Sequence, residues 1–102
     1  MYDYVIVGAG SAGCVLAHRL TEDPACSVLL LESGGADTRK EFHIPAAFSK
    51  LFQSAYDWSY YTEEQAHLKQ RTIYIPRGKV LGGSSSINAM IYMRGNRYDY
   101  DH

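Results

Sequence analysis

At 102 residues the chain is long enough for at most one domain, and a chain of this length buries a modest share of its surface. Its formal net charge of -1 provides no basic surface for nucleic acid. No apolar run approaches the ~20 residues needed to span a bilayer, and the first strand starts too early to leave room for a signal peptide, so we expect a cytoplasmic protein.

The first 32 residues follow the pattern of a complete dinucleotide-binding βαβ unit. An apolar strand is predicted at 4–7, a Gly-Ala-Gly-Ser-Ala-Gly loop follows at 8–13, and a second apolar strand at 28–31 ends in Glu32. The helix between the strands is predicted over 11–23, because Pro24 follows it and one of its faces is apolar. That face comprises Ala12, Val15, Leu16, Ala17 and Leu20.

The glycines and the helix start of this loop have distinct physical roles in such a unit. Gly8 allows a sharp turn off the strand, Gly10 lets the backbone approach a pyrophosphate, and Gly13 brings the helix close to the sheet. The amide N–H groups of Ser11 and Ala12 lie at the helix start, where they face the phosphate anion.

The acid at the end of the second strand restricts the cofactor. Glu32 is placed to accept hydrogen bonds from an adenosine ribose, and a carboxylate there repels the 2′-phosphate of NADP. The unit is therefore predicted to bind ADP as part of FAD or NAD, with NADP disfavoured.

The remaining polar and cysteine residues of this unit, and the segment after it, are predicted to be structural. His18 is expected to be solvated, and Cys14 and Cys26 are expected to be buried small residues, since their spacing fits no metal site or disulfide pattern. Pro45 suits a first helical position, so a short helix is predicted over 45–53.

An antiparallel hairpin is predicted next, with strands at 57–62 and 71–75 joined by the polar segment 63–70. Trp58 has two open interpretations, a core aromatic residue or a ring stacked on a cofactor, of which the first is the commoner. The acidic residues of this region are predicted to be solvated: Asp57, Glu63 and Glu64.

A second glycine-rich motif covers residues 77–90. Its two adjacent glycines permit close backbone approach, its serines can cap a helix, and Ile87, Met90 and Ile91 would share one face of that helix, which would end near Arg94 and Gly95. The motif thus predicts either a second helix N-terminus that meets an anion or simply a capped helix after a turn.

These motifs together resemble the glucose-methanol-choline (GMC) family of FAD-dependent oxidoreductases. The resemblance rests on residues 2–13, 31–34, 56–58 and 76–95, and it covers nearly the whole chain. It is greatest to the choline dehydrogenase and aliphatic-alcohol dehydrogenase branch. It implies a small-molecule alcohol substrate, which is oxidised to an aldehyde by hydride transfer to flavin N5.

The resemblance also implies roles for individual residues. Some family members attach FAD through a histidine at the place of Ile87, which has no nucleophilic nitrogen, so noncovalent FAD is expected. The glycine loop would bind the pyrophosphate, the end of the second strand the adenosine ribose, and the second motif the ribityl chain and flavin ring. The residues are, in that order, Gly8, Gly10, Ser11, Ala12 and Gly13; Glu32 and Ser33; Val80, Gly82, Gly83 and Ser84, with Asn88 and Ala89 near the ring.

The expected fold class is α/β, a Rossmann-type βαβ unit with a short antiparallel hairpin, incomplete relative to the family domain. Residues 1–102 are expected to be the N-terminal portion of an FAD-binding domain without the substrate domain, inactive alone and without an assignable catalytic residue. Open strand edges predict a homo-oligomer or association with the rest of the polypeptide. Two alternatives remain, an NAD-dependent dehydrogenase unit and a non-enzymatic folding or assembly module.

Overall fold

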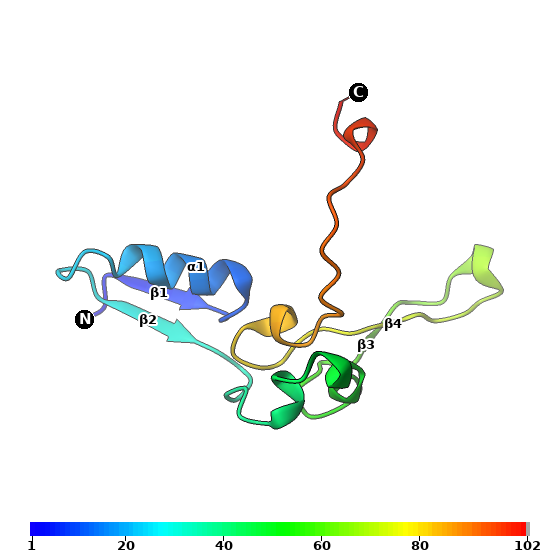
Figure 1. Ribbon diagram of the computed structural model, residues 1–102, viewed down its shortest axis with the longest axis horizontal. Coiled ribbons are helices and arrows are strands. Elements are labelled where there is room, and N and C mark those ends of the chain that lie inside the picture. Colours follow the sequence, from blue (N-terminus) through cyan, green and yellow to red (C-terminus); the bar gives the residue numbers. More distant parts are fainter. Residues whose placement is uncertain (102) are drawn as a thin grey trace.

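The chain begins with the predicted βαβ unit in the computed structural model, which describes residues 1–101 (Figure 1). Strand β1 (Tyr4–Val7), helix α1 (Ser11–Leu20) and strand β2 (Val28–Leu31) follow one another, and α1 lies along one face of the two strands. The strands are parallel, with Tyr4 opposite Val28 and Val7 opposite Leu31. The order strand, glycine loop, helix and strand is therefore confirmed.

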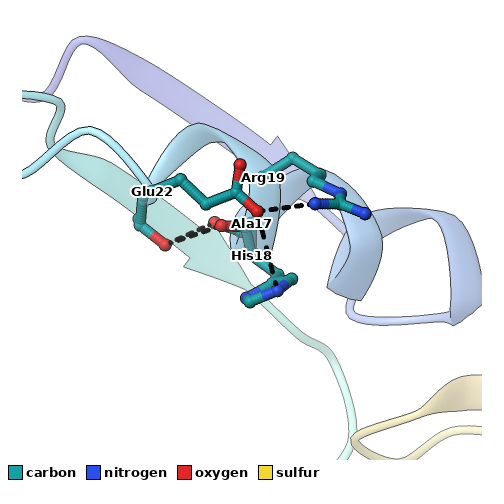
Figure 2. Close-up of polar contacts among 5 residues, drawn as sticks. Ala17, His18, Arg19 and Glu22 are labelled. Atoms are coloured by element: carbon teal, nitrogen blue, oxygen red, sulfur yellow. Dashed lines mark hydrogen bonds and ion pairs between the residues drawn. The ribbon is translucent and has the colours of Figure 1, made fainter.

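Helix α1 ends three residues earlier than predicted, at Leu20. The Thr21 hydroxyl donates to the Ala17 carbonyl at 2.7 Å, while the Thr21 amide also reaches that oxygen at 3.2 Å. A hydroxyl that bonds the preceding turn competes with regular helix continuation. Glu22 then folds back to Arg19, 2.6 Å from its guanidinium, and lies 3.9 Å from the exposed His18 ring (Figure 2). The prediction that His18 is solvated is confirmed.

The apolar face of α1 is covered only in part. Gly13 is buried and Ala17 and Leu20 are half-buried, whereas Val15 and Leu16 are more than half exposed. The prediction that both cysteines are buried was wrong, because Cys14 is exposed and Cys26 is only half-buried; both thiols are free. Cys14 lies off the line of residues 13, 17 and 20 that faces the sheet.

A small core lies outside the βαβ unit. A 3₁₀ segment, η2 (Pro45–Leu51), forms where a short helix was predicted over 45–53, and Pro45 occupies its start as expected. A shorter 3₁₀ segment, η1 (Lys40–Phe42), precedes it in the segment predicted as a loop. Leu51 of η2 packs with two residues of the second glycine motif. The fully buried cluster is Leu51, Val80 and Ile87, with Phe42, Phe52 and Tyr56 against it.

The predicted hairpin is present, with shorter strands than expected. Strands β3 (Tyr60–Tyr61) and β4 (Tyr74–Ile75) are antiparallel, and a 3₁₀ turn, η3 (Ala66–Leu68), lies at the tip of a long arm (Figure 1). Ser59 has φ 51° and interrupts the extended backbone just before β3. Bridges between Asp57 and Gly78 and between Gln65 and Arg71 continue the pairing on either side of the strands.

The prediction of a helix after the second glycine motif was wrong. Only one 3₁₀ turn forms, η4 (Gly83–Ser86), and no serine side chain caps it, since its N-cap residue is Gly82. The Asn88 side chain accepts the Met90 amide at 2.8 Å, and Met90 adopts φ 56°, both incompatible with a continuing helix. A further 3₁₀ turn, η5 (Arg97–Asp99), follows an extended segment that leaves the rest of the molecule (Figure 1).

The described residues form an open structure. The radius of gyration is 17.3 Å, whereas a compact domain of this length has a radius of about 13 Å. Val7 of β1 is 83% exposed and Ile91 is 78% exposed, so apolar surface remains uncovered. Within residues 1–101, no helix has the length and apolarity needed to cross a membrane.

Candidate functional site

A hollow of about 580 Å³ lies at the carboxyl ends of β1 and β2. Ligands of open α/β sheets bind at this edge, because the loops there leave the strands in a position to surround them. The two glycine motifs, the end of β2 and the start of the hairpin all contribute to its lining. The lining residues are Val7, Gly8, Gly10, Leu31, Glu32, Ser33, Trp58, Arg77, Gly78, Gly83 and Ser84.

The three glycines of the first loop are required for different reasons. Gly8 has φ +98°, which disfavours any side chain, and a Cβ on Gly13 would overlap the Gly8 carbonyl oxygen. Gly10 has φ −74°, and a Cβ built on it meets no heavy atom within 4 Å. Neither its backbone nor the surrounding protein therefore requires glycine, whereas a ligand that approaches the Gly10 backbone would. This open space fits the pyrophosphate of a dinucleotide.

Helix α1 presents its N-terminus to the same hollow. Gly10 is the N-cap residue, no side chain caps the helix, and its first turn contains no acidic residue. The first backbone N–H groups, which include those of Ser11 and Ala12, have no partner within the helix. The Ser11 hydroxyl is hydrogen-bonded to the Ser85 hydroxyl of the second motif. The positive end of a ten-residue helix thus faces the hollow, where it can stabilise an anion.

Glu32 connects the glycine loop to the segment after β2. One carboxylate oxygen accepts the Ala9 amide at 2.7 Å, and the other accepts the Gly34 amide at 2.8 Å. These amides of Gly34 and Ala9 hold the pKa of Glu32 below its ordinary value. Each oxygen retains a further lone pair, so Glu32 can hold the loop in place and still accept a ribose hydroxyl. Ser33, exposed beside it, also lines the hollow.

The second glycine motif packs directly on the first. The Gly82 amide donates to the Ala9 carbonyl at 2.7 Å, and a Cβ on Gly83 would lie 2.9 Å from the Gly10 Cα atom. Both Gly82 and Gly83 have positive φ, at 89° and 57°. Because the two backbones are in contact, they form one continuous cradle around the hollow.

The remaining residues of the second motif divide between a second hollow and the core. Ser84 lines both hollows, and Asn88 and Ala89 line the second, which has a volume of about 270 Å³. Val80 is 0% exposed and packs in the core, so in this structure it does not face either hollow. Ile87, at the edge of the second hollow, is also almost wholly buried.

The prediction that Asp57 is a solvated charge was wrong. Asp57 is 6% exposed and accepts the amides of Gln53, Ser59 and Arg77 at 2.8–3.0 Å, together with the Tyr74 hydroxyl. Burial alone would raise its pKa, but these four donors outweigh burial and lower it to about 2. Asp57 therefore joins the end of the hairpin to the segment that enters the second motif.

Trp58 lies at the hollow and outside the core. Its ring is 40% exposed, stacks on Tyr60 at a centroid distance of 5.9 Å, and has the Lys79 ammonium 4.6 Å from its centroid. The prediction that Trp58 is a core residue is therefore wrong, and the sequence assigns no role to Arg77, which also lines the hollow. Trp58 and Arg77 both lie next to a recognised motif, which is the one sequence feature that could have indicated a role. Whether their side chains meet at the same hollow depends on contacts between segments that are distant in the sequence.

The geometry defines an ADP-binding unit of the Rossmann class with a second glycine-rich segment folded onto it. The family model described as GMC oxidoreductase matches residues 2–102, and the chain belongs to this family. The predicted resemblance is thereby confirmed, as is the fold class, an α/β portion of a larger Rossmann-type domain.

Individual relatives agree with this assignment. The chain is 55% identical over 101 residues to "Alcohol dehydrogenase [acceptor]" of Pseudomonas putida, covering 98% of this chain and 18% of that protein. It is 57% identical over 104 residues to "Oxygen-dependent choline dehydrogenase" of Xanthomonas campestris pv. campestris, covering 99% of this chain and 19% of that protein. The chain thus spans about a fifth of the length of these curated relatives.

Solved structures match the fold closely. Pyridoxine 4-oxidase from Mesorbium loti superimposes with a TM-score of 0.90 at 48% identity, over 99% of this chain and 20% of that one. An FAD-dependent oxidoreductase from Chaetomium thermophilum gives a TM-score of 0.83 at 42% identity, over 99% of this chain and 17% of that one.

Proposed function

We propose that this chain binds FAD noncovalently and serves as the cofactor-binding part of an alcohol oxidoreductase. The observation that carries the proposal is Gly10, a glycine that the protein's own backbone and packing do not require, at the start of an uncapped helix. The family membership and the name of the Chaetomium thermophilum structure support FAD as the ligand.

The chain's own residues would hold the cofactor in consecutive parts. The α1 N-terminus would stabilise the pyrophosphate charge, Glu32 would accept hydrogen bonds from the adenosine ribose, and the Gly82-Gly83-Ser84 segment, whose Ser84 lines both hollows, would hold the rest of the dinucleotide. Bound flavin supplies the capacity to accept a hydride from an alcohol. Ile87 offers no nucleophile, which supports noncovalent binding.

The substrate class is proposed from the relatives. The Pseudomonas putida and Xanthomonas campestris proteins are named for an alcohol and for choline, which is itself a primary alcohol. Within residues 1–101, Glu32 is the only carboxylate that lines the first hollow. Its proton affinity is reduced by two amides, so it is a poor general base. We therefore assign to this chain cofactor binding and no proton transfer.

Cofactor retention tests the proposal. The purified chain is incubated with FAD, NAD or NADP, desalted, and assayed for bound nucleotide by its absorbance. We expect FAD to be retained at one equivalent and NADP to be lost, because the Glu32 carboxylate repels a 2′-phosphate. A chain that retains no FAD contradicts the proposed function, and one that retains NADP equally well contradicts the role of Glu32.

A further inference from the structure

Arg77 occupies the boundary between the two hollows. It precedes the second glycine motif, and it and Ser84 are the residues that line both spaces. A ligand that extends from the β2 end into the second hollow must pass these two side chains. Arg77 would therefore lie near the middle of a dinucleotide that occupies both hollows.

Arg77 provides the positive charge at the first hollow. Among the described residues that line this hollow, Arg77 is the one basic side chain and Glu32 the one acidic side chain. Glu32 already accepts hydrogen bonds from two backbone amides. Within residues 1–101, the ion pairs involve His18, Arg19 and Arg39, and Arg77 takes part in none. Its charge is thus available to an anionic ligand.

The backbone of Arg77 is fixed relative to the glycine loop. Its amide donates to Asp57 at 2.8 Å, and its carbonyl accepts the Trp58 amide at 2.8 Å. The next residue, Gly78, is so close to Gly83 that a Cβ on Gly78 would overlap the Gly83 backbone, and Gly83 in turn packs on Gly10. A side chain of arginine's length can therefore reach the space in front of Gly10 from a rigid base.

We propose that the Arg77 guanidinium binds the pyrophosphate of the cofactor, together with the α1 N-terminus. The inference rests on the proposed function. A guanidinium forms paired, charge-assisted hydrogen bonds with phosphate oxygens, which an ammonium does not reproduce. The helix end and Arg77 together would supply positive charge to the anion, while Glu32 would accept hydrogen bonds from the ribose.

Equilibrium binding of ADP and adenosine to the full chain separates this role from a structural one. Both ligands contain the adenosine that Glu32 recognises, and only ADP carries the pyrophosphate. Arg77→Gln is expected to weaken ADP about tenfold to a hundredfold and to leave adenosine unchanged. Arg77→Lys should recover part of the loss, and Arg94→Gln, on the exposed C-terminal segment, should change neither affinity.

The outcomes distinguish this inference from the function on which it rests. If the unmodified chain binds ADP and Arg77→Gln binds it equally well, or loses ADP and adenosine in equal measure, the role of Arg77 is refuted and the proposed function stands. If the unmodified chain binds no ADP, the proposed function fails and this inference fails with it.

Discussion

Replacement of Gly10 by alanine should separate ligand binding from folding. A Cβ at this position meets no protein atom within 4 Å, and φ −74° is open to alanine. Loss of backbone freedom in the unfolded chain favours the variant by about 0.4–1 kcal/mol. Alanine is a poorer N-cap residue than glycine by a similar amount. The two effects oppose each other, so the free energy of unfolding should change by less than about 0.5 kcal/mol.

Binding should respond differently, because the added methyl group occupies the space through which a pyrophosphate approaches the backbone. Loss of even one or two charge-assisted hydrogen bonds corresponds to about 2 kcal/mol, or more than tenfold in affinity. ADP titration by calorimetry, beside urea unfolding of the same sample, measures both quantities.

Gly13→Ala is the matched control for this substitution. Its Cβ would overlap the Gly8 carbonyl oxygen, so the helix must move off the sheet and stability should fall by about 1–3 kcal/mol. If Gly10→Ala binds ADP as tightly as the unmodified chain, the close approach on which the account depends does not occur.

Four further predictions address stability, specificity, activity and association. Asp57→Asn should destabilise the chain by about 2 kcal/mol, since an amide cannot accept hydrogen bonds from all four donors. Because folding lowers the pKa of Asp57 to about 2, its stabilising contribution is complete above the ordinary pKa of 3.8 and should be lost as the pH falls from there toward 2. The Asn variant should not show this acid-induced loss of stability. Glu32→Ala should weaken FAD by roughly tenfold or more in a fluorescence titration, and unchanged affinity would remove Glu32 from the site. The chain supplied with FAD should oxidise choline or a primary aliphatic alcohol no faster than free flavin does, because among the described residues no suitable base lines the first hollow or the second, beside which the flavin ring is expected. Measurable turnover would overturn this. Light scattering at micromolar concentration should detect a homo-oligomer, since Val5, Val7 and Leu31 are 46–83% exposed on an open two-stranded sheet; a monodisperse 11.4 kDa species would show that this surface does not drive association.

The βαβ unit could be predicted because its determinants are local. The apolar strands, the loop 8–13 and the acid at position 32 stand in a fixed order, and each acts within a few residues of its place in the sequence. The same local reasoning placed Pro45 at the start of a helical segment and located the hairpin.

The second motif could not be predicted in the same way, because competing contacts decide its conformation. The apolar spacing of Ile87, Met90 and Ile91 favours a helix, yet Asn88 bonds the Met90 amide and Ile87 turns into the core with Leu51. Apolar periodicity shows which residues could share a helix face. It does not show that a side chain, such as that of Asn88, will take a backbone hydrogen bond that a helix would need.

The burial of Asp57 and the position of Arg77 at the hollow could not be predicted because they depend on long-range contacts. The groups that donate hydrogen bonds to Asp57 lie 2, 4, 17 and 20 residues away in the sequence. The residues next to Asp57 are polar and aromatic, as in an exposed strand, so they do not indicate that it is buried. Arg77 reaches the hollow because Gly34 lies against the Lys79 backbone and Gly83 lies against Gly10. The sequence pattern alone does not show which glycine-containing segments will pack against each other.

Backbone amide chemical shifts of the isotopically labelled chain, recorded while FAD is added, test the central claim most directly. We expect saturable shifts at one equivalent, largest at Gly8, Gly10, Ser11, Ala12 and Gly83, with little change in the hairpin tip at 63–70. Shifts that fail to saturate, or that appear at the hairpin tip while the glycine loop stays unchanged, would contradict it.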